Sequence, residues 1–231
     1  MSNSSLSSAG SLIAASIGIV LLGLLRTPLR WSGAAALALS VVWALAVKPP
    51  DILISTDGHN VGVRGRDGRL HLMRTAKDAF LLKEWLAADA DPRMPTDASL
   101  ADGVSCDEAG CVTPMAGGGF VALALKPEAL ADDCERAALV VTARPAPASC
   151  SPAVMSGDRL RGQGATALWR KRDGFAVDAV RPRGIDRPWS PAVAGAAETE
   201  ATLSPHPNAA HPNAARPVDA TPAEADQQGE D

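Results

Sequence analysis

Four cysteines are the residues of this chain best suited to covalent or metal chemistry. Cys106 and Cys111 enclose a short, turn-like loop, and Cys134 and Cys150 flank an apolar run. Structural zinc sites favour cysteines separated by two residues, whereas these spacings are longer and no histidine accompanies them. We therefore expect disulfides, and of the three possible connectivities we choose the local pairing, Cys106 with Cys111 and Cys134 with Cys150. Four reduced, buried cysteines are the alternative.

Histidines are too few to indicate a metal centre. His59 and His71 stand twelve positions apart in the body of the chain, and a metal site needs more ligands held in fixed geometry. Asp57, Asp67 and His59 form the one crowded polar group, which would serve a hydrolase only through an unrecognised site. We find no nucleotide-binding or nucleophile motif, so we predict no catalytic residue, no metal ligand, no cofactor and no enzymatic activity.

Basic residues gather around the last expected hairpin, where they could hold phosphates without reading a base sequence. The candidates for contact with a DNA backbone are Arg159, Arg161, Arg170, Lys171 and Arg172. Aspartates are interspersed among them, so a solvated face of mixed charge is the alternative. The formal net charge of -4 does not imply a strongly acidic or basic partner, and the lack of tyrosine disfavours a stacking platform for single strands.

The elements that position these residues follow from the pattern of apolar residues after residue 50. Asp57-Gly58 and Asp67-Gly68 separate three short strand-like runs, which is typical of an antiparallel meander. A capping box precedes an amphipathic helix over 79–88. Further strands are expected at 120–125, 138–141, 153–156, 166–169 and 175–180, with a short helix at 128–134. Residues 51–190 are thus expected to form one α+β domain.

Two uncharged, apolar runs precede this domain, over about 9–25 and 31–47. Each is close to the length that crosses a bilayer core, so we predict two transmembrane helices in residues 1–50, with a buried core hairpin as the alternative. Arg26 and Arg30 in the connection place it in the cytoplasm and the following domain outside, which agrees with disulfides. The Ala- and Pro-rich residues 191–231 are expected to be disordered.

This order of features resembles the end of the ComEC family of DNA-uptake channel proteins, over about residues 10–189. The segments that carry the resemblance are Pro49 to Gly58, Trp85-Leu86, Cys106 to Cys111, Asp133 to Val141, Ala153 to Ser156 and Asp186 to Trp189. The resemblance implies a metallo-β-lactamase-like domain on the periplasmic side of the bacterial inner membrane, in a multi-pass protein.

The family's active domain has an H-x-H-x-D-H motif and a later His-His-Gly, and this chain departs from both. It has only His59 and His71 in the domain, and Thr142-Ala-Arg144 stands where the later histidines would be. Hydrolysis by two metals needs several ligands to hold and polarise water. The resemblance therefore implies a degenerate metallo-β-lactamase-like domain that keeps the fold without the nuclease.

The function implied by the resemblance is that of a membrane-anchored, non-catalytic C-terminal part of a ComEC-like protein for DNA uptake in competence. Its expected partners are the membrane, the DNA backbone and the remaining helices of a split channel. The alternative is a structural or protein-interaction module of the cell envelope that does not bind DNA.

Overall fold

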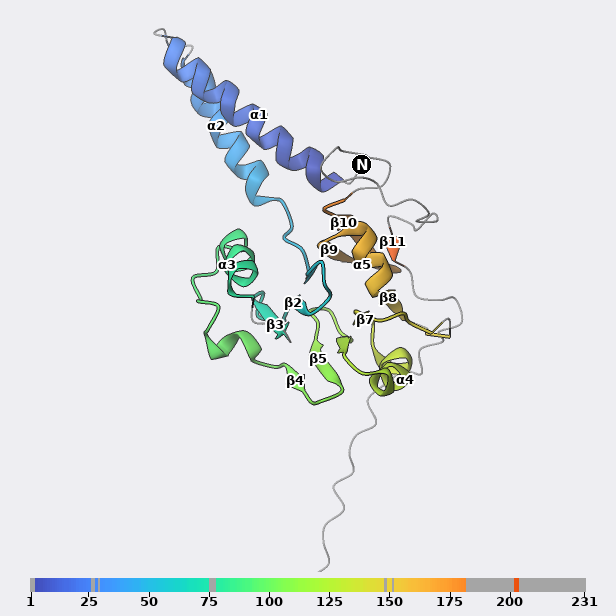
Figure 1. The fold of residues 1–231 in the computed structure, drawn as a ribbon. Coiled ribbons are helices and arrows are strands. Elements are labelled where there is room, and N and C mark those ends of the chain that lie inside the picture. The colour runs from blue at the N-terminus through green and yellow to red at the C-terminus, as the bar shows by residue number, and fades with distance from the viewer. Residues whose placement is uncertain are drawn as a thin grey trace, which may run out of the picture.

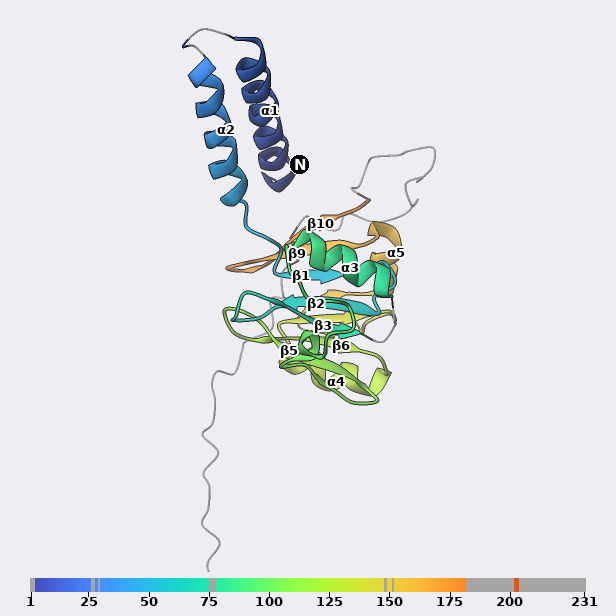
Figure 2. The same cartoon turned by 90° about the vertical axis from the view of Figure 1, so that its left-hand side faces the viewer.

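The computed structural model describes residues 3–25, 28, 30–74, 78–147, 149–150, 152–181 and 202–203, and, from residue 10 onward, the side chains of these residues except Arg74 and Thr202. Figure 1 shows a helical hairpin that projects from a layered α+β body. Figure 2 shows the same arrangement from the side, with α3 and α4 on different sides of the strands.

The hairpin consists of α1 (Asn3–Leu24) and α2 (Arg30–Leu45). Two glycines let the helices approach closely, because a Cβ atom built on Gly18 would lie 3.0 Å from the carbonyl oxygen of Gly33. A Cβ atom on Gly33 would lie 2.7 Å from the carbonyl oxygen of Gly18. Only glycine fits this crossing, as is usual where two helix backbones meet.

The prediction of two transmembrane helices is wrong: among the residues that the structure describes, no helix is long and apolar enough to cross a membrane. The helix α2 has 16 residues, which at about 1.5 Å per residue gives about 24 Å, short of a bilayer core of about 30 Å. The helix α1 begins with the polar residues Asn3, Ser4 and Ser5. The expected location, a multi-pass protein of the inner membrane with its domain on the periplasmic side, depended on these two helices. It is contradicted by the same finding.

The first sheet has six strands in the order β11-β10-β9-β1-β2-β3, and all its pairings are antiparallel. Its strands are β1 (Ile52–Ile54), β2 (Asn60–Arg64), β3 (Leu70–Arg74), β9 (Thr166–Lys171), β10 (Gly174–Ala179) and β11 (Thr202–Leu203). The expected meander and the last hairpin are therefore present, and the register places both Val63 and Leu168 opposite Ile52. Thr202–Leu203 pairs with β10, although these residues belong to the tail expected to be disordered.

The second sheet has five strands in the order β4-β5-β6-β7-β8. They are β4 (Ser105–Cys106), β5 (Gly110–Pro114), β6 (Phe120–Ala124), β7 (Leu139–Thr142) and β8 (Ala153–Met155). The helix α4 (Pro127–Arg136) connects the parallel pair β6 and β7. The short helix α5 (Gly157–Gln163) follows β8. The strands β4 and β5 were not expected from the sequence.

The main core lies between the two sheets, because buried residues of both sheets belong to one cluster. It includes Ile52 and Val63 from the first sheet and Leu123 and Val141 from the second. The helix α3 (Ala79–Ala88) packs Leu82 and Leu86 on the first sheet, whereas α4 packs on the second. The observed fold is thus α+β with two sheets and a helix on each outer side.

Candidate functional site

The strand register brings three connections to one end of the first sheet. Because Ile52 faces both Val63 and Leu168, the chain entering β1, the turn after β2 and the turn after β9 all lie beyond the same ends of their strands. Adjacent strands are about 4.8 Å apart, so the β2–β3 and β9–β10 turns, three strand positions apart, are separated by about 14 Å.

Five exposed cations stand on these three connections, and we call this set the basic end. It consists of Lys48, Arg66, Arg69, Lys171 and Arg172. In the part of the chain that the structure describes, the side chains of Arg66, Lys171 and Arg172 form no ion pair. Asp67 and Asp173 are the acidic residues of the two turns, so the basic end carries an excess of positive charge.

Asp51 links the segment that precedes β1 to the neighbouring strand β9. Its Oδ2 accepts hydrogen bonds from the backbone amide of Arg170 and from Nζ of Lys48, both at 2.8 Å. Trp169 Nε1 donates to the carbonyl oxygen of Lys48 at 3.0 Å. The Lys48 backbone is thereby fixed beside β9, while its ammonium group stays largely exposed.

Two guanidinium groups near the basic end are occupied by internal contacts. Arg170 Nη1 donates to the carbonyl oxygen of Gly118 in the turn between β5 and β6. Arg64 donates to both carboxylate oxygens of Asp89, at 3.1 Å and 2.5 Å, and Arg64 Nε donates to the carbonyl oxygen of Pro50 at 3.1 Å. Both guanidinium groups therefore stabilise the fold. Arg170 is not presented to a ligand, because its guanidinium group is bonded to the turn between β5 and β6.

The acidic residue of the β2–β3 turn is balanced locally. His71 Nε2 lies 3.0 Å from Oδ1 of Asp67, which also accepts the amide of Arg69 at 3.1 Å. The hydrogen bond from His71 is the largest contribution that lowers the pKa of Asp67, so this carboxylate stays charged and partnered. A Cβ atom on Gly65 would lie 2.5 Å from His71 Nε2, so the ring covers the backbone at this position.

The remaining DNA-contact candidates lie at the other end of the sheet. Arg159 and Arg161 belong to α5, which follows β8. Arg161 forms an exposed ion pair with Asp158, and its carbonyl oxygen accepts a hydrogen bond from Arg181 Nη1 at 3.4 Å. The five candidates therefore do not form one surface, because the length of β9 separates this pair from Lys171 and Arg172.

A second polar region lies at the end of the first sheet opposite the basic end. Asp57 Oδ1 accepts from the Ser55 hydroxyl and, at 3.0 Å, from the amide of His59, whose Nδ1 lies 3.4 Å from Asp57 Oδ2. Burial disfavours the charged form of Asp57, but these hydrogen bonds outweigh it and lower its pKa. A Cβ atom on Gly58 would lie 2.9 Å from Cδ1 of Leu160 and 3.7 Å from the amide nitrogen of Ala143, so this turn lies close to α5 and to the segment after β7.

This second region does not include all of the polar group expected from the sequence. Asp67 stands at the basic end, at the far end of β2 from Asp57 and His59. Among the described residues, no group of three or more His, Cys, Asp or Glu side chains is placed to hold a metal ion.

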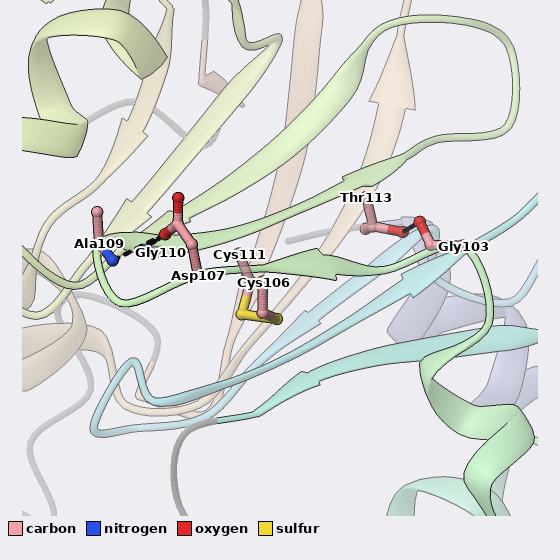
Figure 3. The surroundings of a disulfide bond; sticks show 7 residues. All are labelled: Gly103, Cys106, Asp107, Ala109, Gly110, Cys111 and Thr113. Atoms are coloured by element: carbon pink, nitrogen blue, oxygen red, sulfur yellow. Dashed lines mark hydrogen bonds between the residues drawn. A yellow bond between two sulfur atoms is a disulfide. The ribbon is translucent and has the colours of Figure 1, made fainter.

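Both pairs of cysteines form the disulfides expected from their spacing. Cys106 and Cys111 face each other across β4 and β5 with Cα atoms 4.1 Å apart, and Figure 3 shows their surroundings. Beside them, Asp107 Oδ1 accepts the amides of Ala109 and Gly110, which closes the hairpin turn. Cys134 joins α4 to Cys150, with Cα atoms 4.7 Å apart.

Three members of the basic end, Lys48, Arg66 and Arg69, were not among the sequence candidates. The sequence signal that could have found two of them is the Asp67-Gly68 turn, since Arg66 and Arg69 flank it directly. Lys48 directly follows the second apolar run, where no turn signal marks it. Comparison with known proteins found no matching family model, no similar curated protein and no similar solved structure.

Proposed function

We propose that this chain is a non-catalytic domain of a DNA-uptake protein related to the ComEC family, and that its basic end contacts the phosphate backbone of DNA. The observation that carries the proposal is the placement of five exposed cations on three connections at one end of a sheet. The membrane anchor is not part of this proposal.

Phosphate contact suits the chemistry of the basic end. Lys and Arg side chains on turns can follow a backbone without strict geometry, and phosphate contacts position a protein without reading sequence. The exposed aromatic side chains that stacking on bases would need are few, since aromatic residues are 3% of the chain. Binding to any duplex sequence is therefore expected.

The charge distribution along the chain also supports this use of the basic end. Seven acidic residues but only one arginine occur in residues 191–231, so this segment has a formal charge of -6 and residues 1–190 carry +2. The net charge of -4 therefore conceals a basic body. Because the whole chain carries a net charge of -4, its long-range attraction for DNA is weak. Binding therefore depends on contacts at the basic end and on low salt.

The proposed non-catalytic role rests on the sequence departures from the active family pattern. Where that pattern has histidines after the strand Leu139–Thr142, this chain has Ala143 and Arg144. Thr142 Oγ1 accepts the amide of Arg144 at 3.2 Å, so these residues close a turn.

Charge reversal at matched positions tests the proposal. The variant Arg172→Glu is expected to weaken binding of a fluorescent 30-base-pair duplex at least about tenfold at 50 mM salt, because it removes a phosphate contact and adds repulsion. The control Arg161→Glu reverses an exposed arginine at the opposite end of the sheet and is expected to change the affinity less than about twofold.

The salt dependence gives a second measurement. If all five cations contacted phosphates, the logarithm of the binding constant would fall with the logarithm of salt concentration with a slope of about -4.5. Absence of binding at low salt, or equal effects of the two variants, contradicts the proposal.

The exposed apolar surface of the helical hairpin favours a second candidate function, that of a protein-interaction module without affinity for DNA. The remaining helices of a split channel are the partner that the family resemblance implies. Crosslinking that recovers a polypeptide partner, combined with absence of DNA binding by the purified chain, would favour this candidate over the first.

A further inference from the structure

The two disulfides differ in how far solvent reaches them. Cys106 lies in β4, at the edge of the second sheet, and is exposed. Its partner Cys111 is 4% exposed and belongs to the main core, whereas Cys134 and Cys150 are 8% and 3% exposed. A thiolate that opens a disulfide must reach one of the two sulfur atoms, so access selects which bond reacts. Cys106 is therefore where a reductant can approach the folded chain.

The strand β4 is a short edge strand that the disulfide fastens to β5. It has two residues, and its register places Cys106 directly opposite Cys111. Beside this pairing, the Thr113 hydroxyl donates to the carbonyl oxygen of Gly103 at the long distance of 3.4 Å. Val104, just before β4, packs against the edge of the main core. Opening of the disulfide is thus expected to loosen β4 locally and to leave the rest of the second sheet in place.

The turn between β4 and β5 is held by hydrogen bonds that do not involve the sulfur atoms. Asp107 Oδ1 accepts the amides of Ala109 and Gly110 at 2.7 Å and 2.8 Å (Figure 3), and the Asp107 amide donates to the carbonyl oxygen of Gly110 at 2.9 Å. The carbonyl oxygen of Ala109 in turn accepts the amides of Leu125 and Lys126, at 2.9 Å and 3.0 Å. These bonds anchor the turn at the end of β6. The two thiols therefore stay close together after reduction, and the disulfide can form again.

We propose that the bond between Cys106 and Cys111 is a reversible site of thiol–disulfide exchange with dithiol reductants, whereas the buried bond between Cys134 and Cys150 stays closed. One thiolate of the dithiol attacks Sγ of Cys106, the S–S bond breaks, and its electron pair goes to Sγ of Cys111, which takes up a proton. The second thiolate of the dithiol then attacks the reductant's own sulfur in the mixed disulfide, and the released Cys106 takes up the second proton. The dithiol is oxidised to a disulfide, and the protein disulfide is reduced to two thiols.

Partial reduction of the folded, full-length chain tests this inference. The oxidised chain is treated with dithiothreitol without denaturant, its thiols are trapped with N-ethylmaleimide at successive times, and mass spectrometry identifies the labelled cysteines. Cys106 and Cys111 are expected to be labelled at least about tenfold faster than the other pair, at a rate proportional to the dithiothreitol concentration, because the reductant attacks the folded chain directly. Equal rates for the two pairs, or a rate independent of the dithiothreitol concentration, would mean that the whole fold must open first and would overturn the inference.

Reversibility is measured by adding oxidised dithiothreitol to the selectively reduced chain. The wild-type chain is expected to recover the bond between Cys106 and Cys111. Asp107→Ala removes the acceptor of the turn amides and is expected to slow this recovery at least about threefold, whereas Asp107→Asn keeps a side-chain oxygen for the same turn and is expected to stay within about twofold of the wild-type rate. A wild-type chain that does not recover the bond, or recovery of Asp107→Ala at the wild-type rate, overturns the inference.

Discussion

The carboxylate of Asp51 accepts a hydrogen bond from the backbone amide of Arg170 at 2.8 Å, across 119 positions of sequence. The same carboxylate pairs with Lys48, and the Asp51 amide donates to the carbonyl oxygen of Leu168 at 2.9 Å. This buried residue thereby joins the entry of β1 to β9 and brings two connections of the basic end together.

Replacement of Asp51 by alanine is expected to destabilise the domain by about 1.5–3 kcal/mol, because this buried carboxylate is lost and the partly buried amide of Arg170 loses its acceptor. Urea unfolding measures this change in the free energy of unfolding. Asp158→Ala is the control: its ion pair with Arg161 is exposed, so a cost of at most about 0.5 kcal/mol is expected. Equal costs for the two variants would show that the Asp51 bridge has no special role.

The pair formed by Asp91 and Arg93 predicts a dependence of stability on pH. The side-chain hydrogen bond from Arg93 is the largest cause of the lowered pKa of Asp91, and both side chains are mostly buried. A carboxylate with a lowered folded-state pKa contributes stability above its unfolded value of 3.8, and this stability is lost as the pH falls through the folded-state pKa.

The free energy of unfolding of the wild-type chain is therefore expected to decline as the pH falls below about 4. Asp91→Asn should flatten that decline, and so should Arg93→Gln, because each removes one partner of the pair. Chemical unfolding at pH values from 2 to 6 provides the measurement. A decline that is unchanged in both variants would assign the acid sensitivity to other carboxylates.

The two disulfides are expected to differ in their contribution to stability. Cys134 and Cys150 are 16 positions apart, and a loop of that length predicts about 3 kcal/mol from restriction of the unfolded chain. Cys106 and Cys111 are 5 positions apart, which predicts about 2 kcal/mol. The double alanine variant of each pair, unfolded in urea under oxidising conditions, measures the two costs. A larger cost for the shorter loop would contradict this ranking.

Truncation after Leu203 is expected to strengthen DNA binding. The residues removed contain five acidic side chains and one arginine, whereas β11 is retained. Less negative charge in the chain reduces repulsion of the phosphate backbone, so a gain of about two- to fivefold in affinity is expected at 50 mM salt. The gain should vanish at about 500 mM salt, where charges are screened within a few ångströms. A gain that persists at high salt would point to a non-electrostatic role of the removed residues.

The local elements of the body followed from local sequence signals. Gly58 and Gly68 adopt positive φ values of 71° and 78°, as the Asp-Gly turns of the meander require. Asp78 caps α3 by accepting the amide of Leu81 at 3.0 Å, and the helix covers the expected residues 79–88. Short loops between the cysteines favoured the observed disulfides. These features depend on a few neighbouring residues, and so the sequence was sufficient to predict them.

The tertiary structure decided which of these residues act together. Arg170 and Arg172 are two positions apart, yet one is held by Gly118 from the other sheet and the other is exposed on a turn. Arg66 joins Arg172 only through the pairing of β1 with both β2 and β9. The apolar N-terminal runs likewise specified helices but not their surroundings, because the same composition suits several apolar environments. The pairing of strands and the hydrogen-bond partners of side chains depend on contacts between segments that are distant in the sequence. The periodic pattern within one segment therefore cannot predict them.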